Sequence, residues 1–242
     1  MRPTRIVMWS GPRNLSTAMM RSFGARADTS VVDEPFYAAY LAATGLDHPM
    51  RDEIIAAGET DWRRVAAACS SEPTDPPIRY EKHMTHHMID GFGLDWMGGA
   101  AIAFLIRDPA LVAASYAAKR QEITAADLGS ERQAEIFDHV TAMQGRPPPV
   151  IDANDVRAAP EAVLTKLCTA LGIGFDPAML CWPQGPRASD GIWASHWYGA
   201  VNASTGFAPP DPAPPPLPAS LAKIADAARS HYEKLARYRL TP

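Results

Sequence analysis

The sequence predicts an α/β fold, a three-layer sandwich in which helices cover both faces of a mostly parallel central sheet. Short apolar segments bounded by turn residues alternate along the chain with segments of helical composition, which is the pattern of a parallel sheet. The chain has 242 residues, of which 47% are hydrophobic and 21% charged, as expected of one globular domain with an ordinary core. We therefore expect residues 1–242 to form a single domain.

The expected strands and helices follow one another in chain order. Strands are predicted at residues 6–9, 30–33, 77–81, 100–106 and 149–152. Helical composition follows the first strand at 15–26, and helical patches at 40–70 are interpreted as surface helices or a lid. A long helix is expected at 121–143, with a buried stripe made of Ile123, Leu128, Ile136, Val140 and Met143.

The C-terminal part holds a well-marked helix and a proline-rich segment. Residues 160–171 begin with a proline in the first turn and end before Gly172, which are the boundary signals of a helix. Seven of the eleven residues at 208–218 are proline, which excludes a helix or a central strand there. We interpret this segment as a stiff connector to a final helix at 219–235, although such segments can also dock a partner.

Charge and cysteine content limit the classes of partner. The formal net charge of −4 provides no broad basic surface for nucleic acid or an anionic membrane, so an anion site must be local. The three cysteines are widely spaced, which argues against a disulfide framework or a structural zinc site and favours a cytoplasmic location. The longest apolar stretch, 97–106, is shorter than the roughly 20 residues that cross a bilayer, so no membrane insertion is expected. A homodimer is compatible with these features of the sequence.

A first candidate anion site follows the first strand. Its residues are Gly11, Pro12, Arg13, Asn14, Leu15, Ser16 and Thr17. In an open α/β sheet, a loop between a strand and the N-terminus of a helix directs backbone N–H groups toward a phosphate. Compared with GxxxxGK[ST], Thr17 stands at the lysine position, and Arg13 supplies the positive charge instead. The same pattern also occurs in turns that bind nothing.

A second candidate anion site follows the fourth strand. Arg107 stands at the end of this strand, and Ser115 lies two turns into the following helical segment. The two side chains could hold another phosphate beside the first. Alternatively, Arg107 forms a salt bridge with Asp108 or another carboxylate, and Ser115 is an ordinary helix hydroxyl.

Together the two segments resemble the sulfotransferase superfamily that uses 3′-phosphoadenosine 5′-phosphosulfate (PAPS). In that family a Pro-Lys/Arg-x-x-Ser/Thr-Thr loop binds the 5′-phosphosulfate, matched here by residues 12–17. A later arginine, followed eight positions on by a serine, binds the 3′-phosphate and is matched by Arg107 and Ser115. The resemblance covers about residues 5–40 and 77–118, and it implies a P-loop NTPase-like sulfotransferase fold with PAPS as co-substrate and no metal. Arg13 and Leu15 stand where many members have lysine and glycine.

The resemblance also implies roles for side chains at the ends of the second and third strands. Arg13 would stabilise charge that develops on the donor. Glu34 is the first candidate for the base, because it ends the second strand, adjacent to the loop in a parallel sheet. Its alternative is a carboxylate stabilised by a helix N-terminus. After the third strand, Lys82 could reach the sulfuryl oxygens and His86 is the rival base. A zinc site at histidines 83, 86 and 87 is a weaker interpretation.

In the C-terminal third, members of the superfamily carry an arginine- and glycine-containing loop over the 3′-phosphate and adenine. Arg187 and Gly191 are the residues to which the resemblance assigns this role. The neighbouring Trp193, Trp197 and Tyr198 fit either core packing or adenine contact.

The function expected from these features is transfer of a sulfuryl group from PAPS to a hydroxyl of a small-molecule or carbohydrate-like acceptor. A nucleotide kinase or NTPase of the same fold is the first alternative, and the missing P-loop lysine argues against it. A non-catalytic nucleotide-binding module is the second. Residues 36–70 and 119–145, where the acceptor would be defined, carry little pattern.

Overall fold

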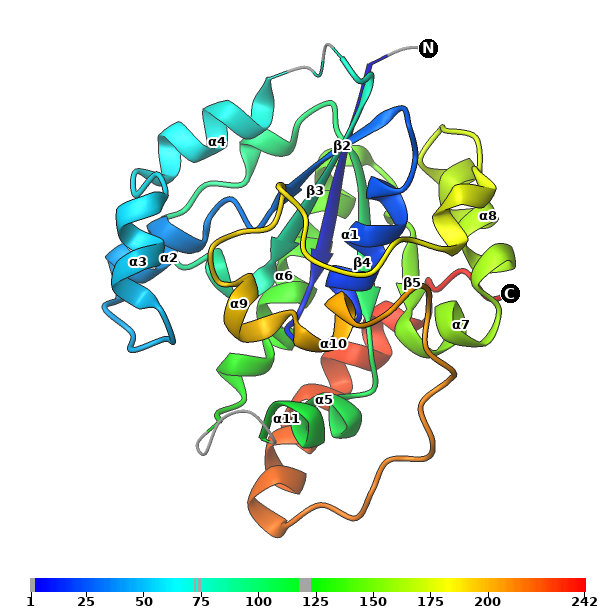
Figure 1. The fold of residues 1–242 in the computed structure, drawn as a ribbon. Coiled ribbons are helices and arrows are strands. Elements are labelled where there is room, and N and C mark those ends of the chain that lie inside the picture. The colour runs from blue at the N-terminus through cyan, green and yellow to red at the C-terminus, as the bar shows by residue number, and fades with distance from the viewer. Residues whose placement is uncertain (1–2, 72, 74, 118–122) are drawn as a thin grey trace.

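A computed structural model describes residues 3–71, 73, 75–117 and 123–242 of the chain (Figure 1). Five parallel strands form one sheet in the order β2-β3-β1-β4-β5. Their bounds are β1 Thr4–Ser10, β2 Thr29–Asp33, β3 Ile78–Met84, β4 Ala101–Ile106 and β5 Val150–Asp152. Each of the five predicted strands is present, so the predicted α/β class with a parallel sheet is confirmed.

Helices cover both faces of this sheet, as the three-layer prediction requires. Alternate residues of β1 point to opposite faces: Ile6 and Met8 enter one hydrophobic core, and Val7 and Trp9 enter the other. The helices are α1 Ser16–Gly24, α2 Tyr37–Thr44, α3 Arg51–Ala57, α4 Trp62–Ser70, α5 Pro109–Ala117, α6 Ser130–Gln144, α7 Ala153–Ala158, α8 Pro160–Ala170, α9 Ala194–Trp197, α10 Gly199–Asn202 and α11 Ala219–Ala236. Short 3₁₀ turns include η1 Thr85–His87 and η3 Ala126–Leu128.

The order of the strands differs from the sequence-based expectation in one respect. The second strand was expected beside the loop that follows the first, but β3 lies between β2 and β1. Burial explains the difference, because β3 is almost entirely buried whereas the middle three residues of β2 are only half-buried, as suits an edge strand. Glu34 therefore approaches the first loop across the end of β3, where its backbone N–H donates to the carbonyl of Lys82 at 2.9 Å.

The prediction of a long helix at 121–143 is wrong for the N-terminal part of this range. Residues 121 and 122 lie outside the described residues, and α6 begins only at Ser130, after Gly129 in the left-handed region at φ 68°. A Cβ at Gly129 would lie 2.7 Å from Oγ1 of Thr85, so the close approach of η1 and the backbone conformation together break the helix there. Of the expected stripe, Leu128, Ile136 and Val140 are buried, Ile123 is partly buried, and Met143 is 38% exposed.

The C-terminal helix α11 packs against α5 and α6 and contributes Leu235 to the core. The proline-rich residues before it, 208–218, contain no helix or strand and run along the outside of the molecule as the orange trace of Figure 1. In the described part of the chain, no helix has the length and apolar character that crossing a membrane requires.

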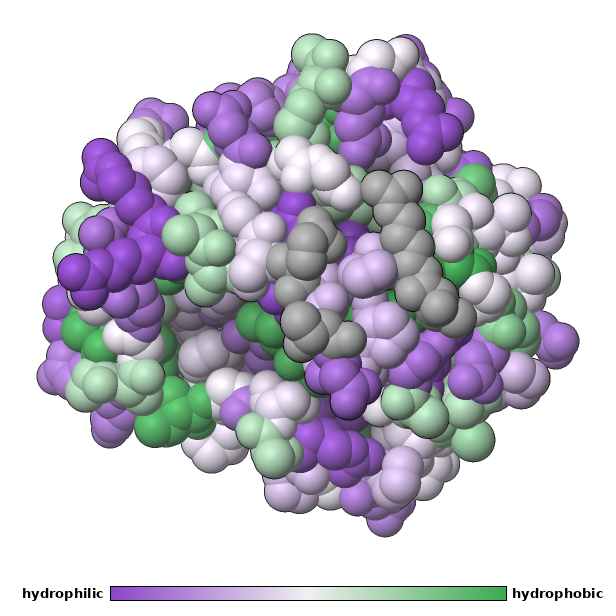
Figure 2. Space-filling model, turned by 90° about the horizontal axis from the view of Figure 1, so that it is seen from above, coloured by the Kyte–Doolittle hydropathy of each residue, from purple (hydrophilic) through white to green (hydrophobic). Residues whose placement is uncertain are grey.

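The two ends of the sheet differ in their surroundings. Figure 2 shows the end at which the strands begin, where hydrophilic and weakly polar residues surround small hydrophobic groups. The carboxyl ends of the strands lie at the opposite end, together with both loops that the sequence analysis singled out. This is the end at which open α/β sheets place their ligands.

Candidate functional site

The loop after β1 has a backbone shape that few residues adopt. Arg13 and Leu15 have positive φ angles of 61° and 71°, a conformation that costs about 1–2 kcal/mol for a residue with a side chain. A Cβ at Gly11 would lie 2.5 Å from the carbonyl oxygen of Leu128, so only glycine fits there. Leu15 thus adopts the backbone that a glycine would take at this position, and strain of this kind is typical of ligand-binding loops.

The N-terminus of α1 faces the space enclosed by this loop. Pro12, Ser16 and Thr17 line a cavity there, and the helix begins at Ser16. The unpaired N–H groups of a helix's first turn attract anions. Asn14 has a different position, because its buried side chain donates to the carbonyl of Leu105 at 3.4 Å and holds the loop against β4.

The second candidate site lies in direct contact with the first. Arg107 donates from Nη1 to the carbonyl oxygen of Arg13 at 2.6 Å, and Nε of Arg13 donates to Oγ of Ser115 at 3.1 Å. Arg107 does not form the alternative salt bridge with Asp108, which pairs with Arg229 at 2.9 Å, but it does pair with another carboxylate, that of Asp211, at 2.9 Å. The structure thus brings together the residues that the sequence assigned to two phosphate groups.

Two further residues, Arg157 and Asp211, complete this cluster and were missed by the sequence analysis. Asp211 pairs with Arg107 at 2.9 Å and also contacts Arg157, which lies in α7. The signal for Arg157 was available, because α7 directly follows β5, whose carboxyl end lies at the ligand-binding end of the sheet. Asp211 carried no such signal, since it stands in the middle of the proline-rich segment.

Positive charge is concentrated at this end of the sheet. Burial and the nearby Arg107 lower the pKa of Arg13. Burial also lowers the pKa of Arg107, although Asp211 acts in the opposite direction. Because guanidinium groups remain charged at neutral pH, two of them in a partly buried site favour binding of an anion.

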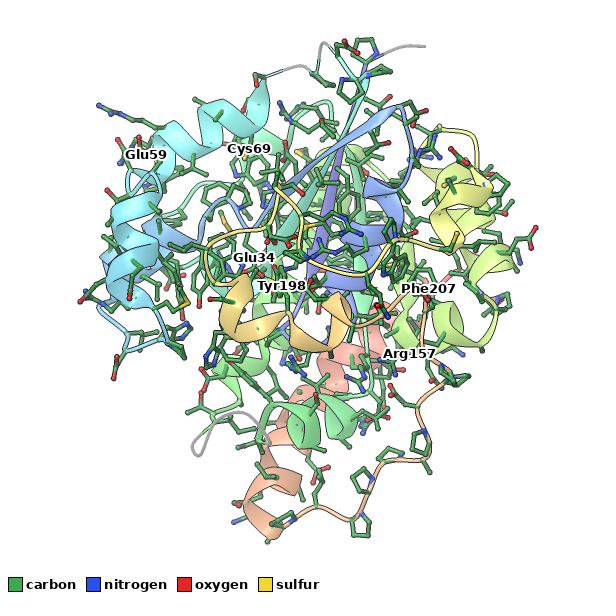
Figure 3. All side chains as sticks on the ribbon, viewed as in Figure 1. Glu34, Glu59, Cys69, Arg157, Tyr198 and Phe207 are labelled. Atoms are coloured by element: carbon green, nitrogen blue, oxygen red, sulfur yellow. The ribbon has the colours of Figure 1, made fainter. Side chains whose placement is uncertain are left out.

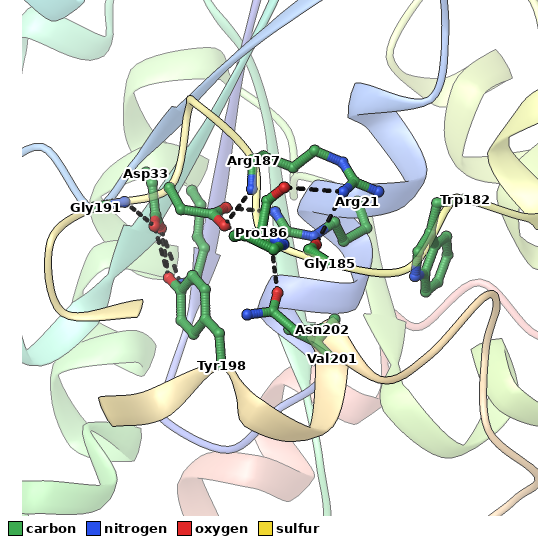
Figure 4. A network of polar contacts seen from close by, with 12 residues as sticks. Arg21, Asp33, Trp182, Gly185, Pro186, Arg187, Gly191, Tyr198, Val201 and Asn202 are labelled. Atoms are coloured by element: carbon green, nitrogen blue, oxygen red, sulfur yellow. Dashed lines mark hydrogen bonds and ion pairs between the residues drawn. The ribbon is translucent and has the colours of Figure 1, made fainter. Parts of the chain in front are cut away.

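An acidic network stands on the other side of the loop. The ammonium group of Lys82 donates to Glu34 at 2.5 Å, to Asp33 at 3.0 Å and to the hydroxyl of Tyr198 at 2.6 Å. The Tyr198 hydroxyl in turn donates to Asp33 at 2.7 Å (Figure 4). All three N–H donors of the lysine are used, so Lys82 holds Glu34 in position, and the side chains of both carboxylates are at most 10% exposed.

Burial controls the protonation of this network. It raises the pKa of Glu34, and the attraction of Lys82 only partly opposes the change. Burial alone would lower the pKa of Lys82, but the two carboxylates outweigh it and raise this pKa well above 10.5. Lys82 therefore stays charged, and Glu34 is a carboxylate with more than usual affinity for a proton.

The three neighbouring histidines do not converge on one point. The rings of His86 and His87 meet edge to face with their centroids 4.4 Å apart, whereas His83 packs against Trp9 and bonds to Glu81 at 3.0 Å. The zinc interpretation of these histidines is therefore wrong. Burial lowers the pKa of His87 well below 6.5, so this imidazole is neutral.

The loop that carries Arg187 and Gly191 contacts the acidic network through a hydrogen bond to Asp33. The backbone N–H of Gly191 donates to Asp33 at 3.0 Å (Figure 4). Asp190 forms a buried ion pair with Arg21 of α1 at 2.5 Å, which fixes the loop to the helix. Arg187 donates to the carbonyls of its own loop and is not among the residues that line the cavities described below. Its contact with a donor stays a prediction.

Two cavities open on either side of Arg13 and form one groove. The first, of about 90 Å³, contains Glu34, Lys82 and His86, and the second, of about 270 Å³, contains Arg107, Ser115 and Arg157. Both are lined by Arg13, Ser16, Thr17, Trp197 and Tyr198. Figure 3 shows Glu34 and Tyr198 on one side of this region and Arg157 on the other. Trp197 and Tyr198 thus belong to the groove, and Tyr198 to the core as well.

A third cavity, of about 650 Å³, meets the first at His86. Apolar residues such as Met88 and Ile89 line it together with carboxylates, among them Asp90 and Glu131. The three cavities thus bring a cluster of arginines, a buried carboxylate and a larger space with a mixed lining next to one another.

Comparisons with known proteins point to one family. Residues 4–237 match the model of a family described as a sulfotransferase domain. Two curated relatives from Arabidopsis thaliana, branched-chain-amino-acid aminotransferase-like proteins 1 and 2, are each 37% identical over 235 and 210 residues, or 97% and 87% of this chain. The chain spans only 40% and 37% of the length of these relatives, so their names describe considerably longer proteins.

Solved structures with the same fold include further sulfotransferases. The sulfotransferase domain from the curacin biosynthetic pathway is 17% identical with a TM-score of 0.57, covering 95% of this chain and 99% of that one. The sulfotransferase domain from the Synechococcus PCC 7002 olefin synthase is 14% identical with a TM-score of 0.56, covering 93% and 94%. At these identities the likeness concerns the fold, and it confirms the fold expected from the resemblance.

Proposed function

The chain belongs to the sulfotransferase domain family, and from this premise we propose that it transfers a sulfuryl group from PAPS to a hydroxyl of a small-molecule or carbohydrate-like acceptor. The observation that carries the choice of donor is the contact between the two anion-binding segments. Arg107 bonds to the backbone of Arg13, and Arg13 bonds to Ser115, so one ligand with two separate phosphate groups can engage both. A 3′-phosphate is what distinguishes PAPS from ATP.

Donor binding is assigned to the groove on both sides of Arg13. The N-terminus of α1, with Ser16 and Thr17, would hold the 5′-phosphosulfate. Arg107 and Ser115 would hold the 3′-phosphate through charge-assisted hydrogen bonds. Trp197, which lines both cavities, offers an aromatic surface for the adenosine between them.

The transfer step is assigned to Glu34, Lys82 and Arg13. PAPS supplies the sulfuryl group, whose sulfur exchanges a phosphate oxygen for the acceptor oxygen, with adenosine 3′,5′-bisphosphate as the second product. Glu34 accepts the proton of the acceptor hydroxyl, and its raised pKa suits a general base. Lys82 positions the Glu34 carboxylate, and Arg13 stabilises negative charge on the departing phosphate.

His86 remains the second candidate base, since it lines both the small cavity that holds Glu34 and the larger one beyond it. We assign the larger cavity to the acceptor. Its mixed lining of apolar side chains and carboxylates suits a compound that carries hydroxyl groups on a partly apolar body.

Titration with adenosine 3′,5′-bisphosphate tests the choice of donor. We expect binding without magnesium, because guanidinium groups and backbone N–H groups supply the charge. A nucleotide kinase or NTPase would instead require the lysine that Thr17 replaces. Magnesium-dependent hydrolysis of ATP, without binding of the bisphosphate, would contradict the proposal.

A further inference from the structure

Asp211 occupies the position where the arginines of the second anion site converge. One of its carboxylate oxygens accepts from Nε of Arg107 at 2.9 Å, and the other contacts Nη1 of Arg157. The side chains are largely buried, with 10% of Arg107, 15% of Arg157 and 12% of Asp211 exposed. A negatively charged group thus already lies between two guanidinium groups that face the groove.

To the described residues of the chain, the segment that carries Asp211 has few other attachments. Of residues 208–218, only Asp211 and Leu217 are half-buried, and the other nine are exposed. The backbone N–H of Asp211 donates to Oδ1 of Asn154 at 2.7 Å. The proline-rich segment is therefore held to the body of the protein mainly at one residue, and releasing it breaks a small set of bonds.

We infer that Arg107 and Arg157 form one clamp for the 3′-phosphate and that Asp211 is an internal substitute for this phosphate, displaced when the donor binds. The inference rests on the proposed function. It assigns a second arginine to the 3′-phosphate and gives the proline-rich segment a defined role. That segment is a strap that closes the clamp when no donor is bound.

Charge explains why the phosphate would replace the carboxylate. Two guanidinium groups and one carboxylate leave a net charge of +1 in the clamp. A phosphate monoester carries a charge of about −1.5 to −2 at neutral pH and offers three acceptor oxygens, so it neutralises the clamp more completely. A ligand without a 3′-phosphate gains nothing from the exchange and leaves the strap in place.

Competition of this kind predicts the effect of removing the carboxylate. Asp211→Asn keeps the size of the side chain and the backbone bond to Asn154 but removes the competing charge. We expect the affinity for adenosine 3′,5′-bisphosphate to increase at least about fivefold, the lower end of typical coupling between two binding events, with the affinity for AMP unchanged. Asp138→Asn, at a side chain that is 60% exposed on α6, is the matched control and should alter neither affinity.

The second arginine is tested by Arg157→Gln. This substitution should weaken bisphosphate binding about tenfold or more and leave AMP binding unchanged, because a bond to a charged phosphate is lost. If the binding of both ligands is weakened equally, Arg157 only supports the fold, and its assignment to the 3′-phosphate is overturned.

Hydrogen exchange of the Asp211 amide, resolved by NMR, reports displacement of the strap directly. This amide should be protected in the free protein through its bond to Asn154, lose protection when the bisphosphate binds, and keep it with AMP. If the bisphosphate binds while the amide stays protected and Asp211→Asn changes neither affinity, the strap inference is wrong and the donor assignment stands. If the wild-type protein binds no bisphosphate, the proposed function itself fails.

Discussion

Lys82 is the residue on which the acidic half of the site depends. Its ammonium group is 1% exposed and bonds to the carboxylates of Asp33 and Glu34. A buried charge is tolerated only when it is paired, and here one cation lies between two anions and offsets much of their mutual repulsion. The identity of this residue therefore determines both the stability of the site and the position of the proposed base.

Replacing Lys82 should be costly for folding. Lys82→Met leaves two buried carboxylates without their cation, so we expect the free energy of unfolding to fall by about 3–5 kcal/mol, measured by urea denaturation. Lys234→Met is the matched control, because Lys234 and its partner Asp138 are 41% and 60% exposed, and an exposed pair contributes at most about 1 kcal/mol. Similar losses in both variants would show that the network around Lys82 is not a paired, buried cluster.

The choice between Glu34 and His86 as the base is also made at the scale of single residues. Glu34→Gln should lower the rate of sulfuryl transfer about 10²- to 10⁴-fold, measured as release of adenosine 3′,5′-bisphosphate in the presence of a hydroxyl acceptor. Because only the carboxylate accepts the proton and burial raises the pKa of Glu34, the wild-type rate should fall as the pH decreases through that raised pKa. His86→Ala should retain this pH dependence. Loss of activity in His86→Ala alone would instead identify the histidine as the base.

At the scale of elements, close contacts between backbones decide where helices begin and end. Gly129 separates η3 from α6, and its carbonyl accepts from the hydroxyl of Thr85 at 2.9 Å. This bond connects the segment before α6 to the end of β3, where His86 and His87 lie. The break in the helix thus shapes the wall of the larger cavity, which we propose holds the acceptor and which Gly129 also lines.

Two glycines with the same backbone conformation allow the effect of the contact with Thr85 on stability to be measured separately. Gly129 and Gly145 both have φ of 68°, but a Cβ would meet Thr85 only at Gly129, and nothing within 4 Å at Gly145. Gly145→Ala should therefore lower the free energy of unfolding by the conformational cost alone, about 1–2 kcal/mol. Gly129→Ala should lower it by about 1–3 kcal/mol more. Equal losses in urea denaturation would argue against a close approach of Thr85.

The strands were predictable because each is a short apolar run between turn residues. The first loop was predictable because its residues are contiguous in the sequence. The order β3 beside β1, with β2 at the edge, was not predictable from such runs, since it depends on which strand is buried more completely. The break at Gly129 was missed for a similar reason. Its cause, Thr85, is 44 residues away in the chain.

The candidate site, like the fold, was predictable from the sequence only in part. Arg13, Arg107 and Ser115 were identified through the resemblance to the sulfotransferase superfamily, and the structure brings them into contact. Arg157 and Asp211 escaped notice because only the folded chain places α7 and the proline-rich segment beside Arg107. For Lys82, the resemblance implied only that it could reach the sulfuryl oxygens, whereas its bonds to Asp33 and Tyr198 depend on tertiary structure.

At the scale of the whole molecule, one end of the sheet collects three distinct environments along a continuous path. Cations gather between β1, β4 and β5, a buried acidic network lies at the ends of β2 and β3, and a larger mixed cavity extends beyond His86. This order matches what a group transfer requires, with a donor anion on one side, an acceptor on the other and a base between them. We propose that a single donor bridges the first and second anion sites.

Calorimetric titration of one variant with two ligands tests this bridging directly. Adenosine 3′,5′-bisphosphate and AMP share the 5′-phosphate and differ only in the 3′-phosphate. Arg107→Ala should weaken binding of the bisphosphate at least about tenfold more than binding of AMP, because Arg107 is proposed to bind the 3′-phosphate of the ligand and not its 5′-phosphate. If Arg107→Ala weakens the binding of both ligands equally, or of neither, no single donor bridges the two sites.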